Sequence, residues 1–244
     1  MSVIITRCVN VHGKKFLLLR EDKGMDRIQI APSILSADFA AMGAAVEKLE
    51  KCGADLIHCD VMDGSFVPKI TFGTDMVAAV KKHTKVPLDV HLMIVNPQNK
   101  VEEFAKAGAD ILTVHAEACG KDLNDVLKHI RNCGIRAGVA VSPDTPVNTV
   151  FDSLEFADML LVMSVYPGLG GQKLIERTLA KAEEARAFME KQGLLRDIEM
   201  DGGITEENVG TVQSVGVNII VAGNTVFRSP DMAKTISLLR AGNR

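Results

Sequence analysis

Short apolar runs alternate with amphipathic stretches from residue 28 to the end of the chain. The runs are about four to eight residues long and the stretches about ten to fifteen, a rhythm typical of strands and helices that alternate in a parallel sheet. The expected strands are 29–35, 56–62, 87–94, 111–116, 136–141, 159–165, 198–201 and 218–222. The expected helices are 38–52, 74–83, 97–107, 121–132, 147–154, 177–192, 206–214 and 232–240.

This repetition predicts a single α/β domain. About eight βα units follow one another without a change in composition, which is the requirement of a closed (β/α)8 TIM barrel over residues 28–244. An open, doubly wound sheet is the alternative. No Gly-x-Gly-x-x-Gly motif follows the first strand, so the dinucleotide-binding signature of that alternative is missing.

Residues 1–27 lie outside the repeating pattern and are expected to form a separate N-terminal extension. Two apolar runs, 3–6 and 16–19, predict a hairpin that turns within 10–15. Since an isolated hairpin is marginally stable in water, the extension either docks on the barrel or is poorly ordered.

Composition and charge exclude several classes of function. The 244 residues are 47% hydrophobic, which suits a globular core, and their formal net charge of −3 gives no basic surface for nucleic acid. No apolar run is long enough to span a membrane. The five cysteines are scattered, with no C-x-x-C pair, as expected of a cytoplasmic protein without a disulfide framework.

Polar side chains gather where the predicted strands end, which is where a TIM barrel carries its chemistry. These residues are Ser33, His58, Asp60, His91, His115, Glu117 and Asp201. Side chains alternate along a strand, so His58 and Asp60 share one face whereas Cys59 points to the other. A buried His and Asp are costly to desolvate unless they are paired. A satisfied ion pair in the core would explain one such pair, but so many converging polar groups indicate a functional site.

Four of these residues are candidate ligands of one divalent metal ion: His58, Asp60, His91 and Asp201. They offer nitrogen and oxygen atoms but no thiolate, a set that suits Zn²⁺, Fe²⁺, Mn²⁺ or Co²⁺. His115 is expected to lie in the core or behind the ligands, with Glu117 as its partner.

Glycines follow three consecutive predicted strands. These loops contain Gly168, Leu169, Gly170, Gly171, Gly202, Gly203, Gly223 and Asn224. Loops of this kind bring backbone N–H groups close to an anion, and the last two βα loops are the usual phosphate site of a TIM barrel. The sequence therefore predicts a small phosphorylated substrate.

Taken in order, these segments resemble the ribulose-phosphate 3-epimerase family. The motifs that carry the resemblance are Ala-Pro-Ser-Ile-Leu-Ser-Ala-Asp at 31–38, 58–68, His-Leu-Met at 91–93, 161–172 and Asp-Gly-Gly-Ile at 201–204. The resemblance implies an enzyme of the pentose phosphate pathway that interconverts D-ribulose 5-phosphate and D-xylulose 5-phosphate with one divalent metal.

The resemblance also implies roles for individual residues. It assigns the four metal ligands named above, makes Asp60 and Asp201 an acid/base pair, and makes Ser33, His91 and the glycine loops contacts of the substrate. We further expect a homo-oligomer.

The chemistry of such a reaction suits two carboxylates. Inverting a carbon beside a ketone removes a proton from one face and returns one to the other, so one acid/base group is ionised and the other protonated. A free Asp titrates near about 4 and is a weak base, so a metal-stabilised cis-enediolate is expected. Met62, Met93 and Met163 lie at the same strand ends, as core filling or as a dry shield over that intermediate.

Three rival functions follow from the same residues. The first is 3-epimerisation of a hexulose 6-phosphate such as D-allulose 6-phosphate. The second is a phosphate-barrel lyase or decarboxylase, but such enzymes need an Asp-x-Lys cluster and residues 60–63 contain no Lys. The third is a non-catalytic sugar-phosphate binder, which would not need both Asp60 and Asp201.

Overall fold

A parallel sheet of eight strands forms the body of the protein. The computed structural model describes residues 9–11, 14–16 and 27–242. Within them the sheet has the order β3-β10-β9-β8-β7-β6-β5-β4, and every neighbouring pair is parallel. The strands are β3 (Gln29–Ala31), β4 (Ile57–Met62), β5 (Leu88–Met93), β6 (Ile111–His115), β7 (Arg136–Val141), β8 (Met159–Met163), β9 (Asp197–Asp201) and β10 (Ile219–Val221). The predicted TIM barrel is confirmed.

The barrel closes between β3 and β4 through a few backbone hydrogen bonds. The N–H groups of Asp55 and Leu56 both donate to the carbonyl of Ile30, at 2.9 and 3.3 Å. The N–H of His58 donates to the carbonyl of Pro32 at 3.1 Å. Because proline has no N–H, Pro32 ends the regular ladder, and β3 is shorter than the predicted strand 29–35.

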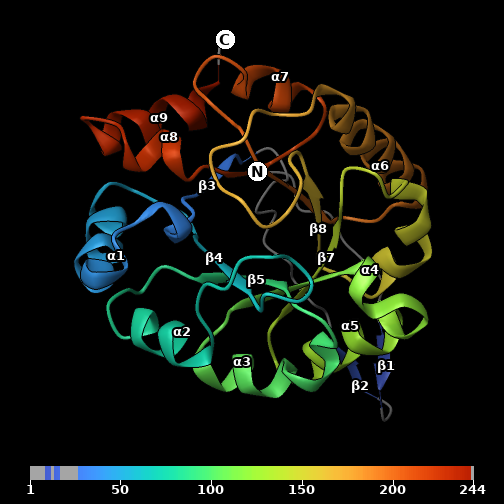
Figure 1. Ribbon diagram of the computed structural model, residues 1–244. Coiled ribbons are helices and arrows are strands. Elements are labelled where there is room, and N and C mark those ends of the chain that lie inside the picture. The colour runs from blue at the N-terminus through green and yellow to red at the C-terminus, as the bar shows by residue number, and fades with distance from the viewer. Residues whose placement is uncertain (1–8, 12–13, 17–26, 243–244) are drawn as a thin grey trace.

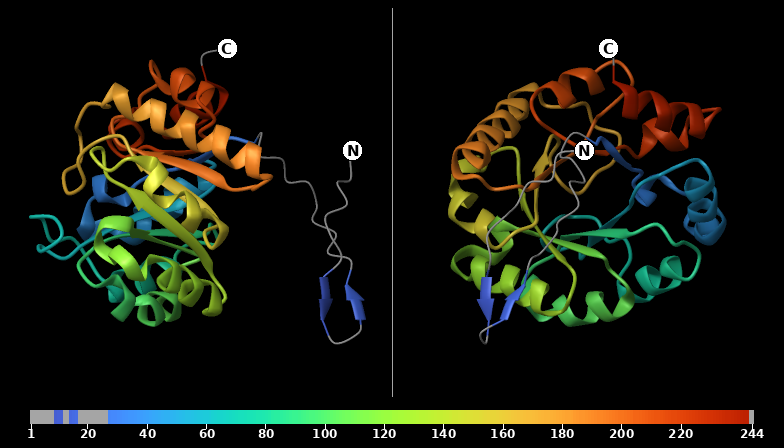
Figure 2. Two further views of the ribbon diagram at one scale, coloured as in Figure 1. Left: turned by 90° about the vertical axis from the view of Figure 1, so that its right-hand side faces the viewer. Right: turned by 180° about the vertical axis from the view of Figure 1, so that it is seen from behind.

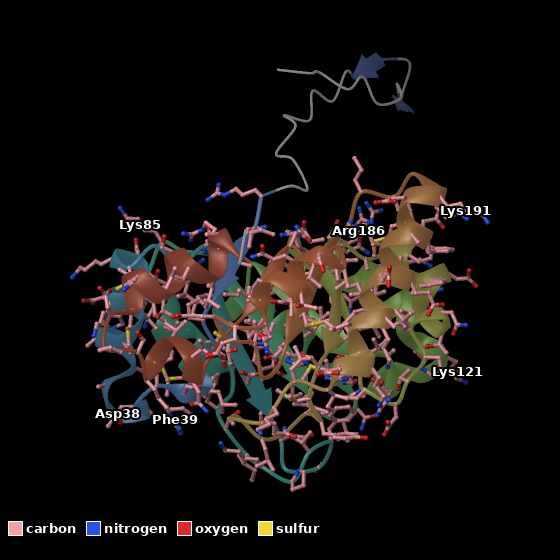
Figure 3. All side chains as sticks on the ribbon, turned by 90° about the horizontal axis from the view of Figure 1, so that it is seen from above. Asp38, Phe39, Lys85, Lys121, Arg186 and Lys191 are labelled. Carbon is pink, nitrogen blue, oxygen red and sulfur yellow. The ribbon has the colours of Figure 1, made fainter. Side chains whose placement is uncertain are left out.

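Helices surround the barrel as an outer ring (Figure 1). They are α1 (Met42–Lys51), α2 (Thr74–Lys81), α3 (Val101–Ala107), α4 (Ala116–Cys119), α5 (Leu123–Asn132), α6 (Leu179–Gln192), α7 (Val209–Ser214), α8 (Asn224–Phe227) and α9 (Met232–Ala241). Charged side chains such as Lys85, Lys121 and Lys191 stand on the outside of the ring (Figure 3). Among the helices of the described ranges, none combines the length and apolar character that a membrane crossing requires.

Short 3₁₀ helices account for most differences from the predicted helices. They are η1 (Ile34–Ser36), η2 (Phe39–Ala41), η3 (Pro97–Asn99), η4 (Gly120–Asp122), η5 (Val147–Glu155) and η6 (Glu176–Thr178). Asp38 caps η2, where its side chain accepts from the N–H of Ala40, rather than one long helix as expected. The prediction also missed α4 and α8, which are single turns and too short to show a helical period.

The structure places an antiparallel pair of strands in the N-terminal extension. They are β1 (Val9–Val11) and β2 (Lys14–Phe16). The predicted strand 3–6 lies outside the described residues, as does most of 16–19. The chain reverses direction between Val11 and Lys14, so the predicted turn within 10–15 is confirmed. The strands themselves lie closer to the turn than predicted. The single alternation of Val9, Asn10 and Val11 is a weaker signal than the continuous apolar runs on either side.

The barrel interior is apolar at one end and polar at the other. Its amino-terminal layer consists of Leu56, Ile111, Met159 and Ile219, at or just before the first residues of alternate strands. Ala31 and Val221, at the ends of β3 and β10, belong to the same apolar cluster. Beyond that layer the inward positions hold His58, Asp89, Thr113 and Glu199, all fully buried. Beyond them the mouth of the barrel carries Asp60, His91, His115 and Asp201. The views in Figures 1 and 2 show the loops of this carboxyl-end face gathered around the mouth.

We predict that Asp55→Ala destabilises the closure of the barrel. The Asp55 carboxylate accepts from the N–H of Ile30 at 2.9 Å and from Arg27 and Arg240 at 2.8 Å each. Removing it leaves a backbone donor unpaired at the seam, which costs about 1–3 kcal/mol. Urea unfolding measures the change, and the exposed Asp152→Ala is the control, expected within about 0.5 kcal/mol of wild type. Equal midpoints for the two variants would contradict the role of Asp55.

Candidate active site

Four predicted ligands meet at the carboxyl ends of β4, β5 and β9. One ligand atom from each of His58, Asp60, His91 and Asp201 lies within 4.8 Å of the others. Asp60 Oδ1 is 3.4 Å from both His58 Nε2 and His91 Nδ1. Neither ring nitrogen has a hydrogen-bond partner within residues 27–242. Two buried lone pairs that face one carboxylate are the donor set of a divalent metal site, so these residues fit the predicted ion.

Strand register produces this convergence. β4 and β5 are neighbours, and Asp60 is the register partner of His91. On the other side of the barrel, Asp201 at the end of β9 is the register partner of Met163. Cys59 packs in the core between the barrel and its helices, where burial raises the pKa of its thiol. The predicted faces of β4 are therefore confirmed.

A second carboxylate lies behind His58. Nδ1 of His58 is 2.6 Å from Oδ2 of Asp89. Because a carboxylate only accepts, Nδ1 donates to Asp89, and in the neutral imidazole Nε2 then keeps its lone pair. Glu199 Oε1 lies 3.5 Å from the same Nδ1. Burial, and then the charge of Asp89, raises the pKa of Glu199 well above its usual range, so only one of the two acids is ionised.

The sequence interpretation missed Asp89 and Glu199, although a signal was present. Each lies two residues before a predicted ligand, His91 or Asp201, and so on the same face of its strand. The period of two would have placed both inside the barrel, directly behind the ligands.

His91 has a longer connection on its outer side. Its Nε2 is 2.9 Å from Nε2 of His115, and Nδ1 of His115 is 3.1 Å from Oε2 of Glu117. Burial lowers the pKa of His115 to about 4. The other oxygen of Glu117 accepts from the N–H of Ser142 at 2.8 Å and from the hydroxyl of Thr145. The expected pairing of His115 with Glu117 is confirmed.

The two candidate acid/base carboxyl groups have opposite pKa shifts. Burial by itself would raise the pKa of Asp60, but electrostatic attraction to the imidazole of His58 and then to that of His91, each 3.4 Å from Oδ1, holds it far below its usual range. Burial, and then repulsion by Asp60, raises the pKa of Asp201 to about 7. Ser33 donates to the remaining oxygen of Asp60 at 2.5 Å. Two carboxyl groups with separated pKa values are the usual arrangement of an acid and a base.

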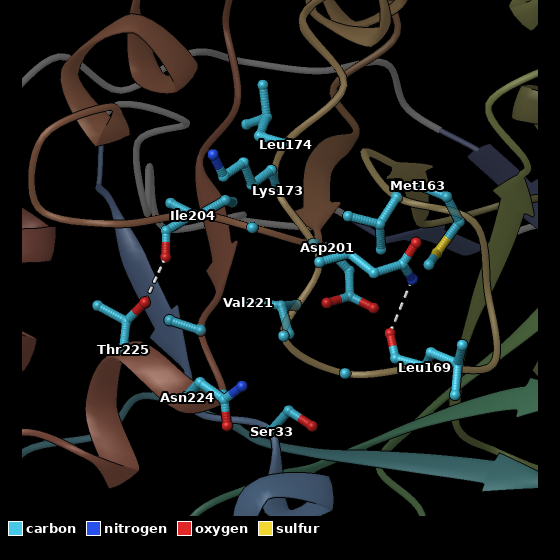
Figure 4. A pocket seen from close by; sticks show the side chains of 18 of the residues that line it. Ser33, Met163, Leu169, Lys173, Leu174, Asp201, Ile204, Val221, Asn224 and Thr225 are labelled. Carbon is cyan, nitrogen blue, oxygen red and sulfur yellow. Dashed lines mark hydrogen bonds between the residues drawn. The ribbon is translucent and has the colours of Figure 1, made fainter.

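A cavity of about 740 Å³ opens above the cluster (Figure 4). The predicted residues that line it are Ser33, Asp60, Met62, Met93, Met163, Gly168, Leu169, Gly170, Gly171, Asp201, Gly202, Gly203, Gly223 and Asn224. His58 and His91 are fully buried and are not part of the lining. The structure thus brings the predicted site together, with the two histidines behind the surface of the cavity.

Side-chain hydrogen bonds that the sequence interpretation missed shape the glycine loops. Thr225 donates to the carbonyl of Ile204 at 2.6 Å, and Gln172 donates to that of Leu169 at 2.8 Å (Figure 4). Gly203 has φ +66°, and a Cβ there would lie 2.2 Å from the N atom of Leu174. Only glycine permits this close approach of two backbones, which leaves bare N–H groups at the cavity.

The three methionines close the cavity on its apolar side. Met62 and Met93 pack with Val67, and Met163 packs with Leu161 and its neighbours. Each is at most 3% exposed, although all three line the cavity. Their side chains present a polarizable surface without exchangeable protons beside Asp60 and Asp201.

Comparison with known proteins gives the relatives of this chain. Residues 29–227 match the model of the "Ribulose-phosphate 3 epimerase family". The chain is 48% identical over 216 residues to the ribulose-phosphate 3-epimerase of Bacillus subtilis, covering 87% of this chain and 98% of that protein. It is 44% identical over 218 residues to the chloroplastic ribulose-5-phosphate-3-epimerase of Arabidopsis thaliana, which covers 89% of this chain and 78% of that protein.

Solved structures with lower identity share the fold. A 3-hexulose-6-phosphate synthase matches 88% of this chain and 98% of its own, with a TM-score of 0.61 and 21% identity. A structure of KGPDC from Streptococcus mutans matches 88% of this chain and 97% of its own, with a TM-score of 0.67 and 12% identity. At this identity the likeness concerns the barrel alone.

We predict that Asp89→Asn weakens metal binding at the cluster. The amide keeps the size of the side chain but removes the charge that holds the proton on Nδ1 of His58. Loss of such an outer partner costs about 10–100-fold in metal affinity. Titration of the metal-free protein with Mn²⁺ measures the change. Cys59→Ala, on the same strand but facing away, is the control with affinity unchanged. An Asp89→Asn protein that binds Mn²⁺ as tightly as this control would contradict the role of Asp89.

Proposed function

The chain belongs to the ribulose-phosphate 3-epimerase family and is an enzyme of that activity, and we propose that Asp60 and Asp201 carry out the inversion. The substrate is D-ribulose 5-phosphate and the product is its C3 epimer, D-xylulose 5-phosphate. The observation that supports this most directly is the pair of carboxyl groups on β4 and β9, which line the same cavity and have pKa values shifted in opposite directions.

The proton transfers balance within the pair. The ionised carboxylate removes the proton from C3, and the electrons of that bond move through C2 to the ketone oxygen. The resulting enediolate is planar at C3. The protonated carboxyl then donates its proton to the opposite face of C3, and the electrons return, which leaves the inverted carbon. After one turnover the two carboxyl groups have exchanged protonation states, so the same pair serves the reverse direction.

The cluster would hold one divalent ion through His58 Nε2, His91 Nδ1, Asp60 and Asp201. We propose Zn²⁺, Fe²⁺, Mn²⁺ or Co²⁺, because the donors are nitrogen and oxygen atoms. When bound, such an ion acts as a Lewis acid that stabilises negative charge on the substrate oxygens. Ser33 fixes the second oxygen of Asp60, and this keeps the carboxylate in one orientation.

The cavity supplies the remaining parts of substrate binding. The glycines at 168–171, 202–203 and 223, with Leu169 and Asn224, would bind the phosphate through backbone and amide N–H groups. Met62, Met93 and Met163 would exclude water from the enediolate. The names of the relatives favour a pentulose over a hexulose phosphate. The homo-oligomer and the cytoplasmic location stay predictions.

We predict that Asp60→Asn and Asp201→Asn each lower turnover by about 10²–10⁴-fold, because an amide cannot exchange a proton with C3. A coupled assay for xylulose 5-phosphate measures turnover. Solvent-deuterium incorporation at C3 then reports on the remaining carboxyl group, which still reaches one face. The exposed Asp75→Asn is the control with normal activity. Turnover near wild type in a folded Asp60→Asn or Asp201→Asn protein would rule out the two-carboxylate scheme.

We also predict that removal of the metal abolishes activity and lowers stability. Activity should return on adding a divalent ion from the set above. An ion at about 100 times its dissociation constant stabilises the folded state by about 2.7 kcal/mol, which thermal unfolding detects. Full activity in protein that elemental analysis finds metal-free would contradict the proposed cluster.

A further inference from the structure

We propose that Glu117 is a positioning residue that determines, through His115, which nitrogen of His91 carries the ring proton. The inference deepens the proposed function, since it rests on His91 as a metal ligand. Glu117 lies in α4, outside the lining of the cavity, so it has no contact with the substrate.

Three consecutive contacts connect Glu117 with the ligand cluster. Glu117 Oε2 is 3.1 Å from His115 Nδ1, and His115 Nε2 is 2.9 Å from His91 Nε2. His91 Nδ1, on the far side of that ring, is 3.4 Å from Asp60 Oδ1. Both imidazoles are fully buried, so water does not offer alternative partners. The ring of Phe66 lies 4.8 Å from that of His115 and limits its rotation.

The donors and acceptors along this path permit one assignment with two neutral rings. The Glu117 carboxylate only accepts, so His115 Nδ1 carries the proton of its ring. His115 Nε2 is then an acceptor, and His91 Nε2 must donate to it. The single proton of His91 is used there, which leaves a lone pair on Nδ1. This is the His91 nitrogen that faces Asp60 and has no partner within residues 27–242.

Each proposed histidine ligand is thus connected to a carboxylate on its outer side, and the two connections differ in length. His58 is held directly by Asp89 at 2.6 Å. His91 is held by Glu117 with one further imidazole between them. In each case a carboxylate holds the proton on the nitrogen that faces away from Asp60.

Glu117→Gln would disturb this assignment for a specific reason. One oxygen of Glu117 faces His115, and the other accepts from Ser142 N–H and from Thr145. In glutamine one of these oxygens becomes an NH₂ donor. If the NH₂ faces Ser142, two donors oppose each other. If it faces His115, it donates to His115 Nδ1, so the His115 proton lies on Nε2 and donates to His91 Nε2. His91 is then protonated at Nδ1, where the metal would bind.

The first test needs no substitution. Long-range ¹⁵N–¹H NMR of the metal-free, full-length protein distinguishes the two tautomers of each histidine. We expect His115 to be protonated at Nδ1 and His91 at Nε2. A His115 ring protonated at Nε2 alone, or at both nitrogens, would overturn the proposal.

The second test compares Mn²⁺ affinities of the metal-free proteins. We expect Glu117→Gln to bind Mn²⁺ about 10–100-fold more weakly, and to approach normal turnover once saturated. Glu47→Gln is the matched control, because Glu47 pairs with His83 at 2.9 Å on the surface. Thr145→Val removes the loop contact of Glu117 but keeps His115 bound, so it should stay within about twofold of wild type.

The outcomes separate the alternatives. Affinity unchanged in Glu117→Gln, or reduced equally in Thr145→Val, would overturn the positioning role. If Glu117→Gln does not fold, the NMR assignment of the unsubstituted protein decides. If the wild-type protein binds no Mn²⁺, Zn²⁺, Fe²⁺ or Co²⁺, the metal site fails, and the tautomers still test the hydrogen-bond path.

Discussion

A buried imidazole in this barrel can offer a lone pair to the mouth only if its other nitrogen has an acceptor. His58 and His91 meet that requirement with different partners, Asp89 directly and Glu117 through His115. Without those acceptors, either ring could carry its proton toward Asp60, and the pocket between them would hold a donor instead of a ligand. Asp89 is fully buried, and the hydrogen bond that it accepts from His58 offsets part of the cost of that burial.

The layers of the barrel explain how such a polar cluster is tolerated. The amino-terminal layer, with residues such as Leu56 and Ile219, is apolar and closes the barrel from below. The carboxyl-end layer carries the charged groups close to the cavity, where Asp201 is partly exposed. Between them lies one mixed layer in which Asp89 and Glu199 share a single charge. The amino-terminal ends of the strands thus contribute stability, and their carboxyl ends carry the groups for chemistry.

The parts of this site that the sequence predicted depend on local rules. The period of two placed His58 and Asp60 on one face, and the position of the glycines after successive strands placed the loops at one end. Asp89 obeyed the same rule but was overlooked beside His91. Pairings such as Glu117 with Ser142 depend on strand register and on the tilt of the barrel, which no local pattern encodes. The single-turn helix α8 was missed for a different reason, because four residues are too few to show a helical period.

The network around Glu117 also reaches the loop after β8, which lines the cavity. Glu117 accepts from Ser142 N–H at the start of the loop after β7. In that loop Asp144 accepts from Tyr166 at 3.1 Å and from Arg177 at 2.6 Å. Tyr166 begins the glycine-rich segment proposed to bind phosphate. Hydrogen bonds and short backbone segments therefore connect Glu117, which positions His91, to the glycine-rich segment that begins at Tyr166. A change in that loop therefore has a physical route to the proposed ligand cluster.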